Sequence, residues 1–154
     1  MPKFQTQRRV GHSAAQMFDL VADVEAYPQF VPLCTALRVR DRRRDEAGRD
    51  VLVADMEVGY KAIREKFSSR VLMDKAALQI TVDYLDGPFS RMHNVWSFAA
   101  AEGVSAQSDV KFFIDYEFRS RMLGLLMGSM FDTAFRRFTA AFEARADKIY
   151  GRSA

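Results

Sequence analysis

Few side chains in this sequence have the types and spacing that catalysis or metal binding requires. The two histidines, His12 and His93, are far apart and form neither an HxxxH nor an HExxH motif. No cluster of aspartate and glutamate offers the oxygen ligands of a metal site. Cys34 is the single cysteine, so neither a disulfide framework nor a cysteine zinc site can form. We therefore expect no metal, no cofactor and no catalytic residue.

Three polar residues could still take part in acid–base chemistry. Glu65 is predicted to share a strand face with apolar residues, Asn94 shares a face with Trp96, and Tyr84 lies on another strand. A general acid and base must converge in one cavity, and these residues are scattered along the chain. We expect a protein that is not an enzyme, with a cyclase or hydrolase as an alternative.

Two of these residues have other roles open to them. Glu65 could lie in water at a rim, pair with an arginine, or hydrogen-bond a ligand head group. Asn94 could contact a ligand carbonyl or bond to the backbone.

Length and composition indicate one globular domain. The chain has 154 residues with a formal charge of +3, and 49% of the residues are hydrophobic against 28% charged. The basic excess is too mild for a dedicated nucleic-acid binder. No stretch approaches the roughly 20 apolar residues that span a bilayer, and the N-terminus lacks an apolar signal region. We expect a single domain over 1–154 and a cytoplasmic protein.

The periodicity of apolar residues predicts the elements that would position these groups. Lys3–Val10 is predicted to be a strand, and Ser13 can cap the short helix that follows. Pro28 and Pro32 break that helix into a second short helix and a connector. Six strands in hairpin succession come next, and the period then changes to that of a helix over 120–150.

Some details of the strands stay open at this stage. In the strand over 51–58, either the even-numbered or the odd-numbered residues can face the core. A three-residue turn at Asp86-Gly87-Pro88 predicts that Val82 pairs with Met92. Glu102-Gly103 predicts another turn.

The order of elements predicts a fold. Successive short turns favour an antiparallel sheet, and its apolar face needs a cover that only the C-terminal helix is long enough to supply. We predict an α+β fold, in which a curved antiparallel sheet of about seven strands wraps around that helix. Two short helices follow the first strand.

A cavity between sheet and helix would be lined by inward-facing side chains. The chain has 13 phenylalanines and 8 methionines, whose flat or flexible side chains suit a greasy ligand. The alternative is that they simply fill the core. The candidate ligand-binding residues are Phe30, Val31, Glu65, Phe67, Val82, Met92, Asn94, Trp96, Phe112, Ile114, Phe118, Leu123, Met127, Met130, Phe131 and Phe138.

Two further segments each have two interpretations. Met122–Phe131 is apolar around most of the helix and holds two glycines. It is either a buried helix end packed closely on the strands, or a gate or surface that enters a bilayer, with Arg119 and Arg121 at anionic head groups. The five arginines within 38–44 form either a solvated edge or a contact for ribosomal RNA or an anionic membrane.

Several stretches carry a resemblance to a known group. They are YPQFVPLC (27–34), EKFSSRV (65–71), DGPF (86–89) followed by WSF (96–98), and FEARA (142–146). With the predicted order of elements, they resemble the helix-grip fold of the START and polyketide-cyclase superfamily. More narrowly, the chain is similar to the coenzyme Q-binding protein family, whose bacterial relatives include the ribosome association toxin.

This resemblance implies a function. Members of the family hold a polyprenyl quinone, such as ubiquinone, in an apolar cavity between sheet and helix, and support respiration as carriers or chaperones without turning over a substrate. We expect a hydrophobic small-molecule ligand and a transient, peripheral contact with the inner membrane. The toxin branch implies the alternative that the protein contacts the ribosome and blocks the joining of its subunits.

Overall fold

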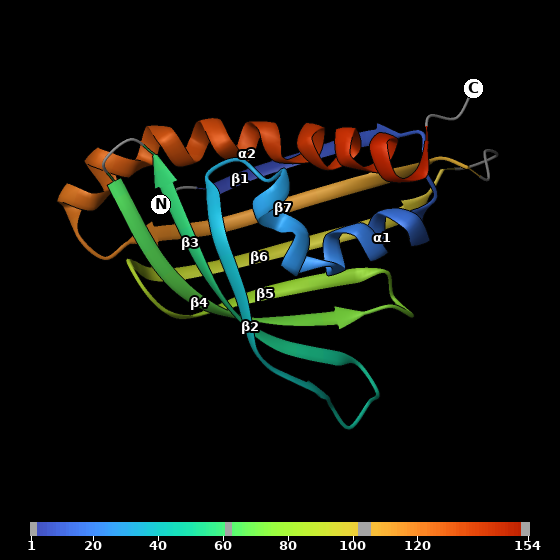
Figure 1. Ribbon diagram of the computed structural model, residues 1–154, viewed down its shortest axis with the longest axis horizontal. Coiled ribbons are helices and arrows are strands. Elements are labelled where there is room, and N and C mark those ends of the chain that lie inside the picture. Colours follow the sequence, from blue (N-terminus) through green and yellow to red (C-terminus); the bar gives the residue numbers. More distant parts are fainter. Residues whose placement is uncertain (1–2, 61–62, 102–105, 152–154) are drawn as a thin grey trace.

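The computed structural model describes residues 3–60, 63–101 and 106–151, so the predicted turn at Glu102-Gly103 lies outside the described residues. These residues form the predicted α+β helix-grip fold (Figure 1). A curved antiparallel sheet with strand order β1-β7-β6-β5-β4-β3-β2 wraps around the long helix α2. The elements are β1 (Lys3–Val10), α1 (Ala14–Ala22), the 3-10 helix η1 (Val24–Gln29), β2 (Cys34–Arg44), β3 (Asp50–Tyr60), β4 (Ile63–Asp74), β5 (Gln79–Asp86), β6 (Phe89–Ala100), β7 (Ser108–Phe118) and α2 (Arg121–Tyr150).

The two short helices follow β1, as predicted. The Ser13 hydroxyl accepts a hydrogen bond from the Gln16 amide, and the Gln16 side chain accepts one from the Ser13 amide. This reciprocal cap satisfies two backbone donors at the start of α1. The Tyr27 hydroxyl donates to the carbonyl of Val21 and so ties η1 to α1.

The structure settles which side chains of β3 face the core. Leu52, Ala54 and Val58 are buried and Met56 is half-buried, so the even-numbered residues point inward. On β7, every even-numbered side chain over 110–118 is buried, as the alternation predicted. The concave face of the sheet is therefore almost continuously apolar.

The hairpin of β5 and β6 differs from the predicted register by two residues. Val82 pairs with Asn94, whereas the turn sequence predicted Met92 at that position. At this end of the hairpin, the Tyr84 hydroxyl accepts a hydrogen bond from the amide of Phe89. Because the shift is an even number, the same side chains still face the core.

Gly87 allows the turn between β5 and β6 to pack on β4. Its φ is +145°, and a Cβ placed there would lie 2.5 Å from the Cβ of Phe67. A larger residue would therefore displace either the turn or β4.

The helix α2 runs across the concave face of the sheet. The Ser120 hydroxyl accepts a hydrogen bond from the Leu123 amide at its start, as predicted, and Gly151 follows its end with φ +80°. The buried residues of this helix are Met127, Phe131, Ala134, Phe135, Thr139, Phe142 and Ala146.

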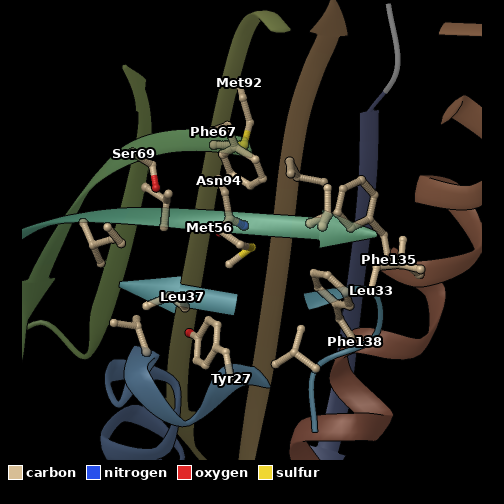
Figure 2. Close-up of a pocket in the computed structure, with 18 of the residues that line it drawn as sticks. Tyr27, Leu33, Leu37, Met56, Phe67, Ser69, Met92, Asn94, Phe135 and Phe138 are labelled. Atoms are coloured by element: carbon tan, nitrogen blue, oxygen red, sulfur yellow. The ribbon is translucent and has the colours of Figure 1, made fainter. Parts of the chain in front are cut away.

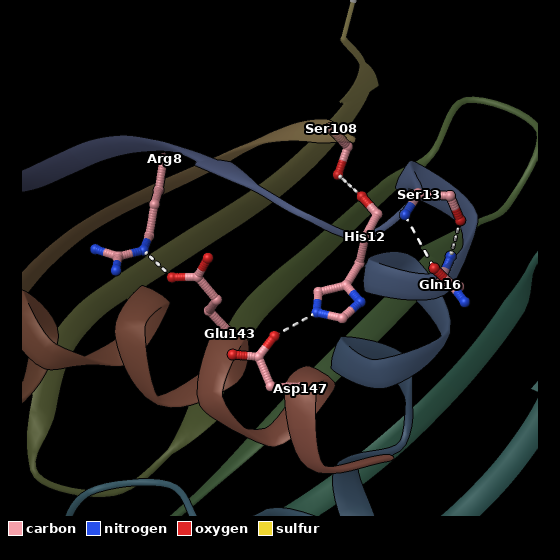
Figure 3. Close-up of polar contacts among 7 residues, drawn as sticks. All are labelled: Arg8, His12, Ser13, Gln16, Ser108, Glu143 and Asp147. Carbon is pink, nitrogen blue, oxygen red and sulfur yellow. Dashed lines mark hydrogen bonds and ion pairs between the residues drawn. The ribbon is translucent and has the colours of Figure 1, made fainter. Parts of the chain in front are cut away.

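Polar contacts fasten the C-terminal half of α2 to the rest of the chain (Figure 3). Nε2 of the buried His12 lies 2.7 Å from Oδ1 of Asp147, and Nε of Arg8 lies 2.7 Å from Oε1 of Glu143. The Ser108 hydroxyl donates to the carbonyl of His12. Among the described residues, the ion pairs that join α2 to other elements all lie in this half.

Candidate ligand-binding cavity

A cavity of about 110 Å³ lies between the concave face of the sheet and α2 (Figure 2). Its wall comes from six strands, from η1 with the connector that follows it, and from the middle of α2. The lining residues are Val24, Tyr27, Val31, Pro32, Leu33, Leu37, Ala54, Met56, Val58, Phe67, Ser69, Val71, Ile80, Val82, Phe89, Met92, Asn94, Trp96, Phe112, Ile114, Phe131, Ala134, Phe135, Phe138 and Phe142.

Ten of the sixteen predicted ligand-binding residues lie in this wall. Strand alternation and helical spacing point nine of them inward, and Val31 belongs to the connector after η1. These ten are Val31, Phe67, Val82, Met92, Asn94, Trp96, Phe112, Ile114, Phe131 and Phe138.

Two predicted aromatic residues lie outside the wall because other side chains hold them. The Phe30 ring packs edge-on against Phe142, 5.0 Å between centroids, and its face lies under the guanidinium of Arg145. The Phe118 ring stacks on Phe89 at 5.1 Å, at the end of β7. Both help to hold residues that do line the cavity.

The other four predicted residues lie beyond one end of the cavity. Leu123, Met127 and Met130 belong to the first turns of α2, and Phe131 is the first residue of the helix to reach the wall. Glu65 is half-buried near the start of β4, opposite Val58 in the ladder, and does not line the cavity. Helical or strand spacing gives the face of an element but not how far along it a cavity extends.

The wall also holds residues that the sequence reasoning did not single out. Phe135 lies one helical turn from Phe131, so helical spacing could have found it. Met56 could not be singled out because the sequence left open which face of the strand over 51–58 points inward. Leu33 has a left-handed backbone, with φ +69°, that no strand or helix pattern indicates. Ser69 shares a strand face with Phe67, so the alternation of β4 could have found it.

Few polar groups face this cavity. Ser69 and Asn94 are 6% and 7% exposed and contribute polar side chains to the wall. Asn94 donates one N–H to the carbonyl of Phe113 at 2.8 Å. This is a bond to the backbone, which the sequence left open as the alternative to a ligand contact. Burial raises the pKa of Tyr27, so its hydroxyl stays protonated and remains bonded to the Val21 carbonyl.

Titratable side chains do not converge here in the part of the chain that the structure describes. Tyr27 is the sole titratable residue in the described wall. Tyr84 accepts a backbone hydrogen bond, and His93 is exposed on the outer face. Burial raises the pKa of Cys34 to about 11, so at neutral pH it is a thiol rather than a nucleophilic thiolate.

The first turns of α2 expose apolar side chains to solvent. Met122, Leu125 and Leu126 are 70%, 80% and 56% exposed, and their spacing places them on one face of the helix. We call these three residues the exposed apolar turn. Arg119 and Arg121 are exposed beside it. No helix in the described ranges is long and apolar enough to cross a bilayer.

This exposure contradicts the interpretation of Met122–Phe131 as a wholly buried helix end. Met127 and Phe131 are buried, whereas the side chains of the exposed apolar turn lie in solvent. Close packing does not explain the glycines either, because a Cβ at Gly128 would meet no atom within 4 Å. The segment is amphipathic, with one face in the core and one apolar face in solvent.

The arginine run lies on β2, an edge strand of the sheet. Four of its arginines each form an ion pair with a carboxylate: Arg40 with Asp55, Arg42 with Glu25, Arg43 with Asp41 and Arg44 with Asp50. Ion pairs between exposed side chains contribute only about 0–1 kcal/mol each to stability, yet these pairs cancel much of the local positive charge.

A curved antiparallel sheet that grips one long helix, with an apolar cavity between them, defines a START-like helix-grip protein. The chain belongs to the family described as "Polyketide cyclase / dehydrase and lipid transport", which it matches over residues 10–143. The predicted resemblance is thus confirmed at the level of the family and the fold.

Its relatives carry names that point to different roles. The chain is 31% identical to the ribosome association toxin RatA of Rickettsia prowazekii, over 97% of this chain and 99% of that protein. It is 30% identical to the mitochondrial coenzyme Q-binding protein COQ10 homolog B of Xenopus laevis, over 97% of this chain and 60% of that protein. The solution structure of an 18 kDa protein from Caulobacter crescentus matches with a TM-score of 0.78 and 36% identity, covering 98% and 99% of the two chains.

The cavity predicts how two alanines of α2 respond to enlargement. Ala134 lines the cavity, whereas Ala146 is buried in the core away from it. Ala134→Leu should change the free energy of unfolding by less than about 1 kcal/mol, because the added methyl groups enter open space. Ala146→Leu should lower it by about 1–3 kcal/mol through overpacking. Urea denaturation measures both, and equal losses would contradict the presence of usable space beside Ala134.

Proposed function

We propose that the cavity binds a polyprenyl quinone of the ubiquinone type, and that the protein acts as a carrier or chaperone supporting respiratory electron transport. The observation that carries this proposal is the apolar cavity with very few polar groups between the sheet and α2. Such a space favours an apolar ligand that has a small polar part. The name of the Xenopus relative supports the choice of coenzyme Q.

The size of the cavity constrains how such a ligand would bind. Sites that enclose a drug-sized ligand measure about 300–1,000 Å³, and this one measures about 110 Å³. A ring and the first part of its tail match this volume better than a whole polyprenyl chain. Met56, Met92 and Leu37 line the wall and can change rotamer to admit more of the tail. Each methylene removed from water adds about 0.8 kcal/mol.

The exposed apolar turn would bring the protein to the membrane that holds such a lipid. Its three side chains can enter the acyl boundary while Arg119 and Arg121 contact anionic head groups. The same helix lines the cavity from Phe131 onward. A transient contact of this kind would leave the protein peripheral to the inner membrane.

A short-tail ubiquinone should quench the fluorescence of Trp96 in a saturable manner. Trp96 is the single tryptophan of the chain and lines the cavity, so a quinone bound there lies beside the indole. Ala134→Leu should weaken binding by roughly tenfold or more, because its methyl groups occupy the site. The control, Ala144→Leu, changes an exposed residue of the same helix and should bind as the wild type does. Absence of saturable quenching, together with no prenyl lipid in a solvent extract of the purified protein, would contradict the proposal.

Replacing Met122, Leu125 and Leu126 with glutamine should weaken binding to vesicles that contain anionic phospholipid by roughly tenfold or more, because apolar area no longer leaves water. The matched control is Leu85→Gln, an exposed leucine on β5. Vesicle sedimentation measures the bound fraction, and added salt should weaken wild-type binding by screening the arginines. Unchanged sedimentation of the triple variant would exclude this face as the membrane contact.

A second candidate function is interference with the joining of ribosomal subunits. It is favoured by the name of the Rickettsia relative, which this chain matches over nearly the full length of both proteins. Overexpression should then lower the fraction of joined ribosomes in a sucrose gradient. Replacing Arg42, Arg43 and Arg44 with glutamate should relieve the effect if the run on β2 is the contact. Gradients that do not change on overexpression would eliminate this candidate.

A further inference from the structure

Two neighbouring serines of β4 have opposite surroundings. The Ser68 hydroxyl lies on the outer side of the sheet and donates to Oδ1 of Asp55 at 2.6 Å. Ser69 faces the cavity and is 6% exposed, yet its hydroxyl makes no hydrogen bond to the described part of the chain. Figure 2 shows Ser69 among the lining residues. Buried polar groups in proteins are nearly always hydrogen-bonded. This hydroxyl is therefore free to bond to a polar atom of a molecule that enters the cavity.

Asn94 offers a second, partly used polar group. Its side chain donates one N–H to the carbonyl of Phe113. The primary amide carries two N–H donors and one carbonyl oxygen. One donor and the oxygen therefore remain for a ligand, at a residue that is 7% exposed and lines the same cavity.

The strand register gives the relative positions of these two residues. Val82 of β5 pairs with Val71 on one side and with Asn94 on the other, and Ser69 lies two residues from Val71 on the same face of β4. Ser69 and Asn94 are thus separated by two strand spacings, about 9.6 Å, across the strands and by two residues, about 6.6 Å, along them. The surface between them, centred on Val82, is apolar.

We infer that Ser69 and Asn94 form a head-group site, in which a ring bearing oxygens on opposite carbons lies over Val82. One ring oxygen accepts a hydrogen bond from the Ser69 hydroxyl, and the opposite oxygen accepts one from the free N–H of Asn94. This inference rests on the proposed quinone binding and names the residues that select the head group. A hydroxyl and an amide can each donate or accept, so the same pair also satisfies the hydroxyl groups of the reduced quinol.

Two probes separate recognition of the head group from binding of the tail. The first is a short-tail ubiquinone, followed by quenching of Trp96. The second is a prenyl hydrocarbon with the same tail and no head group, followed by its competition with the quinone. Ser69→Ala should weaken quinone binding by about three- to tenfold through loss of one hydrogen bond. It should leave binding of the hydrocarbon unchanged.

Matched variants complete the experiment. Ser68→Ala removes a hydroxyl that does not face the cavity and should bind both probes as the wild type does. Ser69→Thr keeps the hydroxyl and should retain quinone binding. If Ser69→Ala binds the quinone as tightly as the wild type, or loses both probes equally, the head-group site is overturned. If the wild type binds neither probe, the proposed function itself fails.

Discussion

One geometric constraint underlies this structure: a single helix must cover a sheet that is much wider than itself. Seven strands measure about 29 Å across at a spacing of about 4.8 Å, whereas a helix with its side chains is about 10–12 Å in diameter. Curvature brings the strands around α2, and α1 with η1 covers part of the remainder (Figure 1). The cavity lies where this cover is incomplete, between the helix and strands β2 to β7, and its apolar wall follows from the alternation of the strands.

Local sequence patterns predicted those features that depend on a single element. The inward face of β7, the caps at Ser13 and Ser120 and the overall order of elements followed from periodicity and capping chemistry. Features that depend on a distant partner were not predictable in this way. The two-residue shift in the register of β5 and β6, and the position along α2 at which the cavity wall begins, Phe131, both depend on contacts between elements. An apolar segment reads the same in sequence whether it is buried or exposed, so the exposed apolar turn became clear only in three dimensions.

The chemistry of the wall distinguishes the roles that this scaffold can support, since fold alone does not determine function. The two relatives with different names are almost equally similar to this chain, at 31% and 30% identity. The cavity presents apolar surface, one free hydroxyl and one half-used amide. These groups can hold and orient an apolar molecule with two oxygens. Within the described wall they do not include the paired titratable groups that proton transfer would use.

The fastening of α2 has a mechanical consequence. His12 and Arg8 clamp the helix at Asp147 and Glu143, whereas its first turns contain Gly124 and Gly128, each of which lowers helix stability by about 1 kcal/mol relative to alanine. The first turns are tied down as well: the Arg119 amide donates to the carbonyl of Pro88 at 2.7 Å, and Met127 is fully buried. The exposed apolar turn is therefore presented at a set position, five residues before Phe131 of the cavity wall. A surface that takes up these three side chains would thereby also set the orientation of the cavity toward it.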